Sequence, residues 1–84
     1  MPATEMAARV AQAIPHLPEL TFWRSPTWRC EELDYGNRVK LCLVAKHPTT
    51  GDIVDLDSRE LIRRENPEPA MRAMIETANA REQR

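Results

Sequence analysis

Residues 28–56 read WRCEELDYGNRVKLCLVAKHPTTGDIVDL, and they contain three strand-like runs separated by two turn signals. Gly36-Asn37 separates the first two runs, because both residue types tolerate positive φ in a hairpin turn. Residues 48–52 separate the last two, because proline presets an early turn position and glycine suits a left-handed one. The pattern predicts an antiparallel three-stranded meander over residues 28–35, 39–46 and 53–56.

The side chains of the first hairpin suggest its register. We expect Leu33 opposite Leu41, which also places Asp34 opposite Lys40 as a favourable charged pair. One face then carries Leu33, Tyr35, Val39, Leu41, Leu43, Ala45 and Ile53. The opposite face carries Trp28, Cys30, Cys42, Val44, Val54 and Leu56. Both faces are partly apolar, so each needs a helix or a partner to cover it.

Helical patterns flank the meander on both sides. Thr4 is a suitable N-cap for a helix over residues 5–14, which Pro15 and Pro18 end. An acid-rich start predicts a short helix over residues 59–65, capped by Asp57 or Ser58. A last helix follows Asn66-Pro67, with an apolar stripe formed by Ala70, Met71, Met74, Ile75 and Ala78. We therefore expect a single α+β domain over residues 1–84: helix, meander, short helix and C-terminal helix.

Composition excludes several classes of protein. The 84 residues are 42% hydrophobic and 30% charged, with a net charge of −1. A chain that grips nucleic acid through phosphates usually has a clear basic excess, which is absent here. No apolar run approaches the roughly 20 residues of a membrane-spanning helix, and the first residues lack a secretory signal. We expect a cytoplasmic protein with reduced thiols and no contact with membranes.

Residues that carry chemistry are few, and their spacing does not match a known motif. Cys30 and Cys42, expected on one sheet face, lack the close pairing of zinc ligands, so we expect free thiols, no metal and no cofactor. His47, Asp52 and Asp55 gather around one turn, but turns select such residue types anyway. Because no nucleophile-elbow, zinc-protease or phosphate-loop pattern is present, we expect no catalytic residue.

Residues 22–29 hold both tryptophans and two arginines, which are the residue types enriched in binding hot spots. Either tryptophan could instead complete a thin core. We expect Trp28 and Val44 on an open sheet face that contacts a second chain. The predicted protein-binding residues are Trp23, Arg24, Trp28, Arg29 and Val44. A basic patch formed by Arg59, Arg63 and Arg64 is the other candidate, unless it is simply a solvated helix face.

The sequence thus favours a noncatalytic protein–protein binding module, such as a small accessory, regulatory or inhibitor protein. Its partner would be another protein or a second copy of itself. The alternative is a nucleic-acid-binding protein that uses Trp23, Arg24, Trp28, Arg29, Arg38 and Lys40. A third hypothesis is a small enzyme or enzyme subunit whose site another chain completes.

Overall fold

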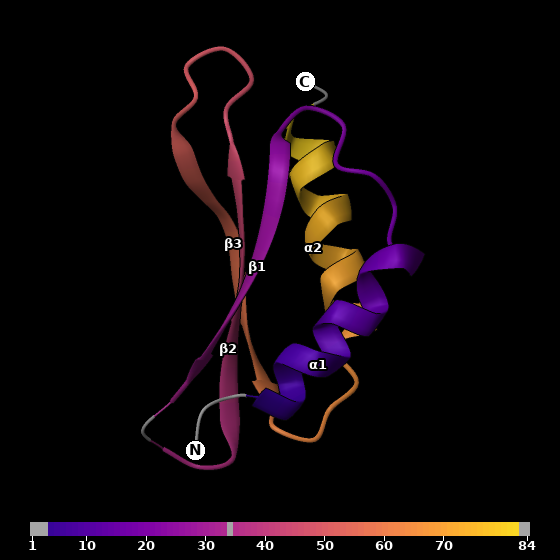
Figure 1. Cartoon of the computed structure of the whole chain (residues 1–84), viewed down its shortest axis with the longest axis vertical. Helices are drawn as coiled ribbons and strands as arrows, with labels where there is room; N and C mark the ends of the chain where they lie inside the picture. The colour runs from indigo at the N-terminus through magenta and orange to yellow at the C-terminus, as the bar shows by residue number, and fades with distance from the viewer. Residues whose placement is uncertain (1–3, 34, 83–84) are drawn as a thin grey trace.

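The computed structural model describes residues 4–33 and 35–82, although the side chain of Thr4 is not described. The elements are α1 (Thr4–Ala13), a 3-10 turn η1 (Ile14–His16), β1 (Arg24–Glu32), β2 (Arg38–Lys46), β3 (Ile53–Ile62) and α2 (Glu68–Arg81). The strands form one antiparallel sheet in the order β1-β2-β3, with both helices on the same side of it (Figure 1). The expected α+β class and its meander are therefore confirmed.

The central strand β2 is buried on both of its faces. Val39, Leu41 and Leu43 belong to the core between the sheet and the helices. Cys42 and Val44 alternate with them, so these two side chains lie on the opposite, helix-free face, where they are also buried. This double burial explains why residues 41–45 form a continuous apolar run, whereas residues 38–41 at the start of β2 alternate between polar and apolar side chains.

Each helix contributes one apolar stripe to the core. The core side chains of α1 are Met6, Val10 and Ala13, and those of α2 are Met71, Met74, Ile75 and Ala78. The predicted stripe of the last helix is thus confirmed, with Ala70 partly buried beside it. Asn66 supports the start of α2 as expected, because its Oδ1 accepts a hydrogen bond from the backbone N–H of Glu68 at 3.1 Å.

The predicted register of the first hairpin is wrong by three residues. Cys30, rather than Leu33, pairs with Leu41, and Glu32 pairs with Val39. An odd shift moves every β1 side chain to the other face, so Trp28 and Cys30 lie on the helix side. The turn is longer than Gly36-Asn37 alone, because strand β1 ends at Glu32 and β2 begins at Arg38. The expected partner Asp34 and the capping side chain of Thr4 lie outside the described part of the chain.

The predicted short helix over residues 59–65 is not present. Strand β3 continues to Ile62, with Arg59 opposite Leu41 and Leu61 opposite Val39. Pairing along the full length of β2 and burial of Leu61 override the local helical propensity. A bulge between the pairs Leu43–Asp57 and Val44–Asp55 leaves Leu56 unpaired and buried in the core.

The two described α-helices are short. Neither is long and apolar enough to cross a membrane.

Candidate protein-binding surface

The segment with both tryptophans is divided between two surfaces. Trp23 is buried in the core. Trp28 is partly buried and packs against the same core from β1. Arg29 pairs with Cys42, which places its exposed side chain on the helix-free face, and Arg24 is exposed at the start of β1. The predicted group therefore does not form one continuous site.

Trp23 is held in a cluster of three rings. Phe22, Trp23 and His47 make mutual edge-to-face contacts, each with ring centroids 5.4 Å apart. His47 Nδ1 accepts backbone N–H groups from Thr49 and Thr50 at 3.2 and 3.3 Å, which fixes the ring at the turn. The cluster joins the segment before β1 to the turn between β2 and β3, which gives Trp23 a structural role.

Trp28 lies in an apolar groove of about 310 Å³, which we call the Trp28 groove. Its lining residues come from the segment after α1, from β1 and from α2: Ile14, Leu17, Pro18, Glu19, Leu20, Pro26, Trp28 and Ile75. Glu19 is the one charged residue in this lining. Ile14 is 47% exposed, which leaves apolar surface uncovered at the groove.

The wall of the Trp28 groove is fixed by hydrogen bonds from α2. Asn79 Nδ2 donates to the backbone oxygen of Glu19 at 2.9 Å, and Asn79 Oδ1 accepts the N–H of Thr21 at 2.9 Å. Arg72 donates to the backbone oxygen of His16, also at 2.9 Å. The segment after α1 is therefore tied to α2 at two points, and the groove is preformed, as ligand sites usually are.

Strand β1 forms an edge of the sheet beside this groove, because it pairs with β2 only. Its first part is irregular: Ser25 has a φ of 51°, and the register shifts between Arg24 and Thr27. Pro26 has no N–H to donate. Regular pairing over residues 27–32 leaves one side of that backbone without a strand neighbour in the described part of the molecule. Such an edge can accept a strand from another chain.

Val44 lies on the other side of the sheet from Trp28. It is 3% exposed and is covered by neighbours on the helix-free face. The expectation that Trp28 and Val44 share one open face is therefore wrong, because the register of β1 differs from the one predicted. The two residues belong to different surfaces.

The three arginines of the predicted basic patch are separated. Arg59 lies in β3 and forms an ion pair with Asp57 at 3.5 Å. Arg63 Nη2 donates to Glu32 Oε1 at 2.6 Å, and Arg63 Nε donates to Asn37 Oδ1 at 3.1 Å. Arg64 is exposed in the turn after β3. Two of the three cations are thus already next to an acidic group.

The cysteines lie on opposite faces, because Cys30 pairs with Leu41 while Cys42 is the next residue of β2. Their expected placement on one face is therefore wrong. Burial is the main cause that raises the pKa of both thiols. Each cysteine therefore forms a thiolate less readily than an exposed cysteine does. Within the described ranges no group of three His, Cys, Asp or Glu side chains is arranged to hold a metal ion.

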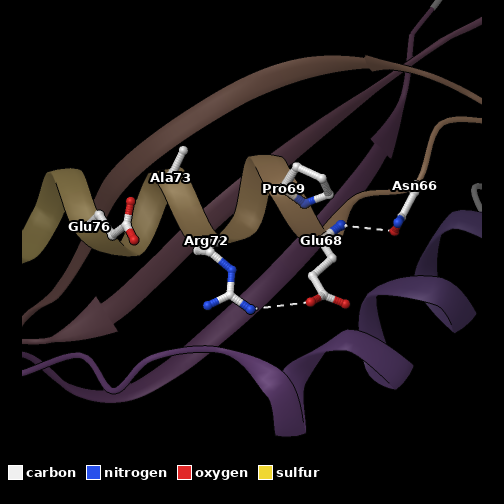
Figure 2. Close-up of a pocket in the computed structure, with 6 residues that line it drawn as sticks. All are labelled: Asn66, Glu68, Pro69, Arg72, Ala73 and Glu76. Atoms are coloured by element: carbon white, nitrogen blue, oxygen red, sulfur yellow. Dashed lines mark hydrogen bonds and ion pairs between the residues drawn. The ribbon is translucent and has the colours of Figure 1, made fainter.

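A second cavity, of about 370 Å³, lies on the outer side of α2 (Figure 2). Its polar groups bond to one another: Arg72 reaches Glu68 at 3.2 Å, one helical turn away, and Asn66 accepts the Glu68 N–H. The view shows Glu76 beyond Arg72, away from this pair. These contacts stabilise the first turns of the helix and explain the polar lining without a ligand.

Sequence reasoning missed most of the groove. Ile14 and Leu17 continue the helical spacing of the first predicted helix, and Leu20 begins a short apolar run that the sequence leaves open as strand or loop. A usable signal was the proline spacing at Pro15, Pro18 and Pro26, which keeps these apolar residues out of regular structure. Comparison with known proteins gives no match to any family model, any curated protein or any solved structure.

Proposed function

We propose that this chain is a noncatalytic module that binds another protein by accepting an extended segment along β1, with an apolar side chain in the Trp28 groove. The observation that carries the proposal is an apolar groove lined by two residues of an edge strand, Pro26 and Trp28. An added strand gains main-chain hydrogen bonds, and a pocket beside it selects the side chain.

The lining of the groove indicates the chemistry of its occupant. Trp28 and Ile14 offer apolar surface, and covering it stabilises a complex by about 25 cal/mol per Å² before the costs of association. Glu19 at the groove disfavours an acidic side chain. The occupant that fits is an aliphatic or aromatic side chain. Arg24 is exposed at the start of β1, but it pairs with Lys46 and so lies on the helix-free face, away from this groove.

The nucleic-acid alternative has less support from the geometry. Stacking of bases needs aromatic faces and cations on one surface. Here Trp23 is buried, and Trp28 lies on the helix side of the sheet. Arg29 and Lys40 lie on the helix-free face, on the other side of the sheet from Trp28.

Selection from a random peptide library displayed on phage tests the proposal. We expect enriched peptides to share an apolar side chain and to form extended structure when bound. Binding should shift the indole NMR signal of Trp28, which lines the groove, and leave that of the buried Trp23 in place. Binding should also persist at high salt, whereas binding to a nucleic acid would fall steeply with salt.

The matched variants are Ile14→Glu in the groove and Ile53→Glu on the helix-free face. Both isoleucines are exposed, so neither change should unfold the chain. Ile14→Glu should weaken peptide binding about tenfold or more, which corresponds to about 1.4 kcal/mol. Ile53→Glu should leave it unchanged. Failure to enrich any peptide, or equal binding by the Ile14→Glu protein, would contradict the proposed function.

A further inference from the structure

The helix-free face of the sheet is a second surface, distinct from the Trp28 groove. Figure 1 shows both α-helices on one side of the sheet, and no helix of the described residues lies on the other. Residues directly opposite one another in an antiparallel pair share a face. The pairs Arg29–Cys42 and Glu31–Lys40 place two β1 side chains on this face. The pairs Val44–Asp55 and Lys40–Glu60 add two from β3.

This face carries apolar side chains that remain exposed. Ile53 pairs with Lys46 and Ile62 pairs with Arg38, which puts both isoleucines on the helix-free face, near opposite ends of β3. They are 63% and 48% exposed. Between their positions along the sheet lie the buried side chains of Cys42 and Val44. Covering two exposed isoleucines would stabilise a complex, because each transfers apolar surface out of water.

The charges on this face alternate in sign. Glu31, Lys40 and Glu60 form one row across the three strands, acid beside base beside acid. The next rows add Arg29 on β1 and Asp55 on β3. A surface of one sign would select a partner of the opposite sign. A surface that mixes both signs offers acids for a second copy's cations and cations for its acids, which is what an interface between two identical faces requires.

We propose that two copies of this chain associate through their helix-free faces. Three strands of nine or ten residues span about 30 Å by 14 Å, or roughly 400 Å² per copy. A standard stable interface buries about 800 Å² per partner, so we expect a weak, reversible dimer that forms only at high protein concentration. The inference goes beyond the proposed function, because it concerns the opposite side of the sheet.

Sedimentation equilibrium of the full chain over about 1 µM to 1 mM tests this dimer. The face variant is Ile53→Glu/Ile62→Glu, in which each new carboxylate lies opposite a cation, Lys46 or Arg38, so the fold is kept. The matched control is Ile14→Glu, at an isoleucine that is also exposed but lies in the Trp28 groove. Wild-type protein and control should rise from 9.7 kDa toward twice that mass, and the face variant should stay at 9.7 kDa.

A wild-type protein that remains monomeric over this range would overturn the inference. So would a dimer that the face variant leaves intact, or a dimer that only Ile14→Glu abolishes, because either result places the contact elsewhere. The face variant should still bind peptides selected on the Trp28 groove. Loss of the dimer therefore remains distinguishable from failure of the proposed function.

Discussion

Arg63 shows at the residue scale how contacts distant in sequence hold this fold together. Its guanidinium donates to Glu32 at 2.6 Å and to Asn37 at 3.1 Å, and its backbone N–H donates to the Asn37 oxygen at 2.7 Å. Its own backbone oxygen accepts a hydrogen bond from Arg9 of α1. One residue thus joins α1, the end of β1 and the β1–β2 turn. From the sequence alone, Arg63 is recognised only as a member of the basic patch with Arg59 and Arg64.

The Glu32–Arg63 pair predicts a specific pH dependence of stability. The hydrogen bond from Arg63 is the main cause that lowers the pKa of Glu32 below its usual 4.5. The Glu32 carboxylate therefore binds a proton more readily in the unfolded chain than in the folded one. The stabilisation from this pair is present above about pH 4.5 and is lost as the pH falls through the lowered pKa of the folded state. Urea unfolding should show Glu32→Gln less stable than wild type at neutral pH, with the gap closing in acid. Arg63→Gln should flatten the same limb; a gap that is constant with pH would contradict the assignment.

The sequence predicts some elements of this fold correctly and others wrongly. The last helix and the central strand are predicted correctly, because each has a strong apolar pattern that burial explains. The β1 register is wrong because a hairpin turn signal does not fix the loop length, and a shift of three residues exchanges the faces. The helix over residues 59–65 is wrong because pairing with β2 is a long-range contact. The Trp28 groove was missed for the same reason, since Asn79 and Arg72 of α2 hold its wall.

The turn between β2 and β3 provides a test of an element that the sequence did predict. Gly51 has a φ of 77°, and its N–H donates to the His47 oxygen at 3.0 Å. Nothing lies within 4 Å of the position where a Cβ would be, so a substitution there adds backbone strain without a clash. Gly51→Ala should destabilise the protein by about 1–2 kcal/mol, whereas Gly51→Asn should cost less, because asparagine tolerates this conformation. Urea midpoints compare the two; equal stability of all three proteins would show that the turn does not depend on glycine.

The whole molecule is a thin, two-layer structure. Its extents are 38 × 23 × 19 Å, and its radius of gyration is 12.9 Å, against about 12 Å for a compact domain of this length. Within residues 4–33 and 35–82, both α-helices lie on one side of the sheet (Figure 1). A small protein of this kind has little stability to spare. The loss of unfolding free energy on substitution should therefore differ measurably between the face under the helices and the helix-free face.

Two valines of the same strand measure that difference. Val39 and Val44 both lie in β2, at 0% and 3% exposure, but Val39 belongs to the core under the helices and Val44 lies on the helix-free face. At low protein concentration Val39→Ala should cost about 2–3 kcal/mol, from lost transfer energy and a cavity, because helices and sheet enclose the site. Val44→Ala should cost about 1 kcal/mol or less, because surrounding side chains can relax into the space. If copies associate through this face, the cost of Val44→Ala should grow with protein concentration while that of Val39→Ala stays constant. Denaturant unfolding at two concentrations gives both numbers, and equal costs for the two valines would show that both faces are packed alike.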